Sequence, residues 1–247
     1  ACSFPPNAGD NFVISSEMKT AIAQTQNAIM KATKILLDGS IVTPTDLQAN
    51  FNDLCSLICD YPVIAMGVIR WVEKSLSNLN FYTTSHFIQL VPMMLFLLQI
   101  VAEVHVLLRD IALAVLDTIL ALRTGLDPVT TLQIHWQILD TVVAFAAVGH
   151  VLPVLQYLER WTSTCDQSYF RHVLSQILEL SEAPYAPAFV RAMFRIMCKP
   201  PVIAALSSVN NIKVLFVEFI RKCEGFVEDE KDRVLLGETK SSYGVVG

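Results

Sequence analysis

Three cationic side chains recur at every fourth position in the last quarter of this chain. Arg191, Arg195 and Lys199 stand at i, i+4 and i+8, so they share one face of a helix. The opposite face of that helix is apolar and carries Phe189, Val190, Met193, Phe194 and Met197. Arg and Lys in such a row can bind phosphates or carboxylates. The spacing therefore predicts a candidate binding surface, the basic ridge Arg191–Arg195–Lys199.

Two interpretations of this ridge stay open. Arg221 and Lys222 lie on a later apolar helix that could pack nearby and extend the ridge toward RNA or an acidic partner protein. Alternatively, the ridge is a solvated helix face whose charges are paired with carboxylates. The carboxylates that we expect as partners are Glu179, Glu182 and Glu218.

A smaller cationic candidate is Arg70 with Lys74, which are also four residues apart. Glu73 lies between them in sequence and on the same face, so internal pairing competes with binding at this site.

The side chains that could hold a metal are scattered. His135 lies on an apolar helix face, where we expect a core histidine with a satisfied ring nitrogen. Cys55 and Cys59 share a helix face at i, i+4, but no two further ligands follow at a spacing typical of a zinc site. Four other histidines never pair at i, i+4, namely His86, His105, His150 and His172. The sequence predicts no metal site and favours packing roles for these residues.

Motifs for catalysis are also missing from the sequence. It has no Gly-rich phosphate loop, no Gly-x-Ser-x-Gly turn and no carboxylate pair beside a base. We therefore expect a protein that is not an enzyme and that uses no cofactor. The six cysteines are spread through apolar segments, which is typical of a reducing compartment, and a net charge of −5 is not that of a general nucleic-acid binder.

The elements that must position these side chains are helices. Apolar residues recur with helical period throughout, and no strand-like alternation is found. Asp127-Pro128 after Gly125 is the clearest boundary between two helices. Helices of this length with short breaks, pairing about every 40 residues, predict an all-α fold of irregular HEAT-like helical hairpins stacked into a curved array. We expect a flexible lead-in over 1–14, the helical-repeat domain over 15–223 and a disordered tail over 224–247.

The apolar composition raises a membrane alternative. Hydrophobic residues make up 53% of the chain and charged residues 17%, against about 25% charged residues in an average soluble protein. The run Phe87–Val106 is about as long as a membrane span, but it contains Glu103 and several other polar residues. Later apolar runs are interrupted by charges at intervals shorter than a span. Buried helices explain this pattern better, so we predict no membrane partner and keep a spanning hairpin over 87–122 as the alternative.

The segment Pro62–Val72, PVIAMGVIRWV, has a narrow polar stripe and is apolar on its other faces, which predicts a mostly buried helix. This segment resembles one in the C/D subunit of the negative elongation factor, the nuclear complex that holds RNA polymerase II in a promoter-proximal pause. GHVLPVLQYLER at Gly149–Arg160 and APYAPAFVRAMF at Ala183–Phe194 agree with the same family in order and approximate spacing, and EFIRKC at Glu218–Cys223 is a weaker match. The likeness runs over 12–223 and covers only the C-terminal part of the family's full length, so we expect a portion of a longer protein.

The resemblance implies an irregular helical-repeat fold and a non-catalytic scaffold in the nucleus. As a member of this family, the chain would bind the A and B subunits of the negative elongation factor and RNA polymerase II, and would repress transcription by promoting pausing. The resemblance also implies contact with RNA and adds Lys19, which falls where the family has a lysine, to the candidate surface. Asp60 and Val148 stand where the family has arginines, which weakens the expectation of RNA binding. A HEAT-type adaptor with unrelated partners is the remaining alternative.

Overall fold

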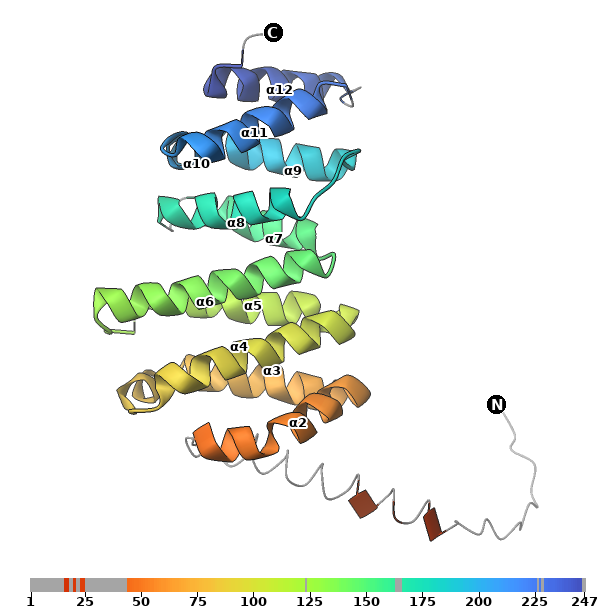
Figure 1. The fold of residues 1–247 in the computed structure, drawn as a ribbon, viewed down its shortest axis with the longest axis vertical. Coiled ribbons are helices and arrows are strands. Elements are labelled where there is room, and N and C mark those ends of the chain that lie inside the picture. Colours follow the sequence, from red (N-terminus) through yellow and green to blue (C-terminus); the bar gives the residue numbers. More distant parts are fainter. Residues whose placement is uncertain are drawn as a thin grey trace, which may run out of the picture.

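The computed structural model describes residues 16, 17, 20, 23, 24, 44–122, 124–162, 166–225, 227 and 229–245. All regular structure over these residues is helical, which confirms the predicted all-α class, and the helices form a stacked array (Figure 1). The α-helices are α2 (Pro44–Asp60), α3 (Pro62–Leu76), α4 (Phe87–Val104), α5 (Arg109–Leu120), α6 (Pro128–Ala147), α7 (Val151–Trp161), α8 (Gln167–Glu179), α9 (Pro187–Met197), α10 (Pro200–Ser207), α11 (Asn210–Cys223) and α12 (Glu230–Tyr243). Two 3-10 turns, η1 (Leu79–Thr83) and η2 (Val106–Leu108), join helices near the start of the array.

The helices lie in two layers. In one layer α2, α4, α6, α8 and α10 pack side by side in that order, and in the other α3, α5, α7, α9 and α12 do the same. Consecutive helices therefore form antiparallel hairpins, each with one helix in either layer (Figure 1). α11 follows α10 at a bend of 119° and packs against α8, α10 and α12, which completes the last repeat. This arrangement confirms the predicted array of helical hairpins.

Capping aspartates and glycines with positive φ mark the ends of the helices. Asp127 caps α6 by accepting hydrogen bonds from the backbone N–H groups of Val129 and Thr130, both at 3.0 Å. Asp166 caps α8 by accepting from the N–H of Ser168 at 2.8 Å. Gly125 and Gly149 have φ of +72° and +89°, values that glycine adopts without strain, at the two ends of α6. Local sequence thus fixes where the chain reverses.

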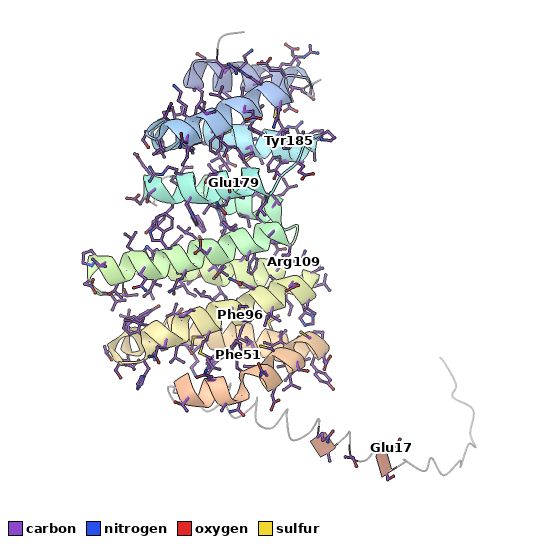
Figure 2. All side chains as sticks on the ribbon, viewed as in Figure 1. Glu17, Phe51, Phe96, Arg109, Glu179 and Tyr185 are labelled. Carbon is purple, nitrogen blue, oxygen red and sulfur yellow. The ribbon has the colours of Figure 1, made fainter. Side chains whose placement is uncertain are left out.

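The side chains between the layers form one continuous apolar core. The buried residues include Phe145 on α6, Phe170 on α8 and Val68 on α3. Figure 2 shows Phe51 and Phe96 on the neighbouring helices α2 and α4. Their ring centroids are 5.9 Å apart, and Phe96, which is 47% exposed, lies at the surface rather than in this core. The polar stripe predicted for α3 is at the surface, where Arg70 and Lys74 are exposed.

α4 is long and apolar enough to cross a membrane, and it is the only single helix of the described chain that meets this criterion. It packs against α2, α3, α5 and α6, and half of its 18-residue window is buried there. The α5 helix that follows has only 12 residues, too few to span a bilayer. α4 ends at a break at His105, which separates it from η2 and α5.

One expectation about the C-terminal part was wrong. The expected disordered tail, 224–247, contains the helix α12, which packs against α9, α10 and α11. Pro200-Pro201 begins the helix α10, because proline is compatible with the first turn of a helix. The expected flexible lead-in, 1–14, lies outside the described residues, and so do most residues of the stretch 15–43.

Candidate interaction surface

The basic ridge lies on α9, and its first member is engaged by α12. Arg191 donates from Nε to Oδ1 of Asp232 and from a terminal nitrogen to Oδ2, both at 2.7 Å. The Asp232 side chain is only 13% exposed, whereas that of Arg191 is 43% exposed. A two-point contact of this kind fixes the orientation of both groups, so Arg191 serves first to hold α12 on the array.

This contact sets the protonation of both groups. The hydrogen bonds from Arg191 and its positive charge hold the pKa of Asp232 below its ordinary value, and the charge of Arg195 acts in the same direction. In return, the carboxylate raises the pKa of Arg191. Both groups therefore stay charged at neutral pH.

A pocket between α9 and α12 shows how the charges of the ridge are balanced. Its cationic lining residues are Arg191, Arg195 and Lys231, and its acidic lining residues are Asp229, Asp232 and Glu238. Equal numbers of cations and carboxylates give this surface no strong excess of either sign. The alternative of a charge-paired face describes the Arg191 end of the ridge, although the partner is Asp232 rather than Glu179, Glu182 or Glu218.

The other predicted cations are spread over the array. Lys222 pairs with Glu218 one turn earlier on α11, at 2.8 Å, and Arg221 is exposed beside it. Arg70 pairs with Glu73 on the surface of α3, at 3.1 Å, and Lys74 is exposed. Lys19 lies outside the described residues. Since α3 and α9 belong to different hairpins, Arg70 and Lys74 stay a separate candidate surface.

Sequence reasoning missed the role of α12. Its composition is polar, so the hydrophobic pattern that marks the other helices is weak there. Two local signals were present: Asp229 accepts a hydrogen bond from the N–H of Lys231 as an N-cap, and Gly244 ends the helix with φ of +67°. Tyr243 is buried and donates its hydroxyl to the carbonyl of Met197 at 3.2 Å, which anchors the end of α12 on α9.

The candidate metal-ligating residues have structural partners. His135 is half-buried, its Nδ1 lies 2.6 Å from the hydroxyl of Tyr169, and burial lowers its pKa, as expected of a core histidine. Cys55 is half-buried, whereas Cys59 is exposed, so only the first of this pair packs as predicted. Over the residues that the structure describes, no group of three His, Cys, Asp or Glu side chains could hold a metal ion.

Comparison with known proteins identifies relatives over most of the array. A family model described as TH1 protein matches residues 10–228. The chain is similar to negative elongation factor D from Sus scrofa, with 28% identity over 185 residues, and to negative elongation factor D from Mus musculus, with 27% identity over 185 residues. Each alignment covers 73% of this chain, and the chain spans about 30% of the length of these curated relatives.

Proposed function

This chain belongs to the TH1 protein family, and on that premise we propose that it is a non-catalytic scaffold subunit of a negative elongation factor complex. In this proposal it acts in the nucleus. It binds the A and B subunits of that complex and RNA polymerase II and promotes promoter-proximal pausing, and it performs no reaction of its own.

The observation that carries the proposal is the agreement between the family match and the fold. The match over residues 10–228 includes every described α-helix from α2 to α11, so the similarity extends over a continuous two-layer array rather than one motif. Arrays of this kind provide extended, rigid surfaces, which suits a protein that holds other proteins together. Binding of these partners by this chain is a proposal, because the chain corresponds to about 30% of the length of its relatives.

Co-expression with an N-terminal segment of the A subunit of the negative elongation factor tests the proposal. We expect the two chains to co-purify and to elute together in size-exclusion chromatography. A variant with Phe145→Ala, which disturbs the buried face of α6, serves as a control for dependence on the folded array. Separate elution of two well-folded chains would contradict the assignment to this complex and favour a HEAT-type adaptor with other partners.

RNA is the least supported partner, and the part of the ridge that can contact phosphate is Arg195 with Lys199. Arg195 is exposed and Lys199 is half-buried, and neither forms an ion pair closer than 4 Å with the described residues, whereas Arg191 is bound to Asp232. We expect Arg195→Glu with Lys199→Glu to weaken binding of a single-stranded RNA probe in a gel-shift assay about tenfold, with the helical content unchanged. Equal RNA binding by the double variant and the unchanged chain would make the ridge an ordinary solvated face.

A further inference from the structure

Four of the turns at one side of the array share an unusual charge pattern, whereas α11, which ends at the same side, has Arg221 and Lys222 in its last turn. At this side α2, α4, α6 and α8 end and α3, α5, α7 and α9 begin (Figure 1). None of those four ending helices has a basic residue in its last turn. Three of them have an exposed carboxylate there instead, namely Asp60, Glu103 and Glu179.

This arrangement does not stabilise the helices that carry it. The C-terminal end of a helix has a partial negative charge, so a carboxylate there is unfavourable and a cation is favourable. The other layer follows the favourable rule at the opposite side of the array, where α3, α7 and α9 carry Lys74, Arg160 and Arg195 in their last turns. None of the three carboxylates forms an ion pair with a described residue, although Glu179 accepts a hydrogen bond from Gln176 at 3.1 Å. Since Asp60 and Glu103 do not serve helix stability, another role accounts for them better.

Large apolar side chains project into solvent beside these carboxylates. Leu107 is 91% exposed, Val63 is 82% exposed and Val106 is 64% exposed, whereas most aliphatic residues of the array are buried. Val104, which follows Glu103, is also exposed. Solvent-exposed aliphatic side chains grouped at adjacent turns are typical of contact surfaces between proteins.

Two contacts hold the adjacent turns together. His105, at the end of α4, lies with Nε2 2.5 Å from the carbonyl oxygen of Ile58 near the end of α2. His150, before α7, lies with Nε2 3.0 Å from Oδ1 of Asp110 in the first turn of α5. Figure 2 places Arg109 at this side of the array, where its guanidinium group donates to the backbone carbonyls of Ala102 and Glu103. The turns thus form one rigid surface, and its central cation is engaged by backbone oxygens.

We propose that this surface, the corner edge formed by Asp60, Val63, Glu103, Val106, Leu107 and Asp110, binds a segment of another protein that carries bulky apolar side chains flanked by Lys or Arg. The apolar side chains of the partner pack against Leu107, Val106 and Val63. Its cations lie near the carboxylates of Asp60, Glu103 and Asp110. Nucleic acid is disfavoured at the corner edge, because its phosphates would face these carboxylates. The chemistry of the corner edge does not depend on which complex the chain belongs to.

Fluorescence anisotropy with short labelled peptides tests the proposal on the whole 247-residue chain. The probe is a peptide of Leu and Lys, compared with a Leu/Glu peptide and a Ser/Lys peptide of the same length. We expect the affinity of the Leu/Lys peptide to be at least about tenfold higher than that of either counterpart. We also expect this affinity to fall as salt is added. Equal binding of the Leu/Lys and Ser/Lys peptides would overturn the proposal, because the aliphatic side chains would then contribute nothing.

Substitutions locate the site of binding. Leu107→Ser and Glu103→Lys change exposed side chains of the corner edge, and we expect each to weaken binding of the Leu/Lys peptide about five- to tenfold. The matched controls are Val129→Ser, at an exposed aliphatic residue where α6 begins on the opposite side, and Glu238→Lys on α12. Equal effects of test and control variants would mean non-specific attraction between a cationic peptide and an acidic protein. Light scattering tests whether the chain associates with itself. Self-association that is abolished by Leu107→Ser would assign the corner edge to a second copy of the chain and would also overturn the proposal.

Discussion

Single polar side chains join successive hairpins of this array. The carbonyl of Ile58 lies in the last turn of α2, where the position that would normally donate to it is Pro62, which has no N–H. His105 of the next hairpin lies within hydrogen-bonding distance of that oxygen. His172 on α8 reaches Asp140 on α6 in a similar way, at 2.8 Å. A few specific hydrogen bonds thereby fix the position of successive hairpins relative to each other, in a packing that is otherwise apolar.

The Arg191–Asp232 pair leads to a prediction about pH. The folded chain holds the pKa of Asp232 below its ordinary value, about 4, so the carboxylate stabilises the fold fully above that pH. This stabilisation is lost as the pH falls through the lowered pKa, because protonation then removes the charge. We expect Asp232→Asn to lower the thermal midpoint by about 2–4 °C at neutral pH, and the difference from the unchanged chain to shrink progressively as the pH falls below about 4.

Thermal melts followed by circular dichroism over this pH range check that expectation. Glu230→Gln is the control, since Glu230 is 81% exposed and its contact with Arg233 is long, at 3.6 Å. It should leave the midpoint nearly unchanged at every pH. A gap between Asp232→Asn and the unchanged chain that persists in acid would show that the ion pair is not its cause.

At the scale of elements, α12 is the second-layer helix of the last repeat. It covers α9 through Asp232, Thr239 and Tyr243, which contact Arg191, Cys198 and Met197. Terminal repeats of helical arrays usually have one polar outer face, because no further repeat covers them. The polar composition that made this segment look disordered is what such a terminal helix requires.

Removal of α12 should therefore loosen the end of the array more than its middle. In a chain ending at Gly225, we expect faster amide hydrogen exchange in α9 and little change in α4, because each repeat is stabilised mainly by its neighbours. Val234→Ser, at a residue of α12 that is 57% exposed, is the control that keeps the helix in place. Unchanged exchange in α9 after the truncation would mean that α12 contributes little to its stability.

At the scale of the whole molecule, stability depends on one apolar core between two layers. Phe145 on α6 is fully buried, and α6 contacts α4, α5, α7 and α8. We expect Phe145→Ala to lower the free energy of unfolding by about 3–5 kcal/mol, since it removes a large side chain from a close-packed site. Urea unfolding followed by circular dichroism measures this loss.

Leu132→Ala on the same helix separates core packing from helix propensity. Leu132 is 44% exposed, so its replacement should change the free energy of unfolding by only about 0.5 kcal/mol. Similar losses for Phe145→Ala and Leu132→Ala would contradict a core that lies between the layers.

The sequence by itself determined the local features of this protein. Helical period, proline and aspartate at helix starts and glycine at helix ends depend on residues within a few positions of each other. They therefore predicted the buried helix α3 and the start of α6 at Asp127-Pro128. The apolar segments also identified the family, because residues of a shared core have a recognisable order. The failure at α12 has the same origin: its helix depends on contacts with α9, about 40 residues away, and its own pattern is weak.

Only the tertiary structure decided which surface is available to partners. In the sequence Arg191 is one of three equivalent cations, and its engagement by Asp232 follows from the stacking of α12 on α9. Likewise, Asp60 is far along the chain from Glu103 and Leu107, and the three come to one side because the hairpins turn there. Surface charges are only weakly coupled to local folding, so their neighbours are set by the way the hairpins stack.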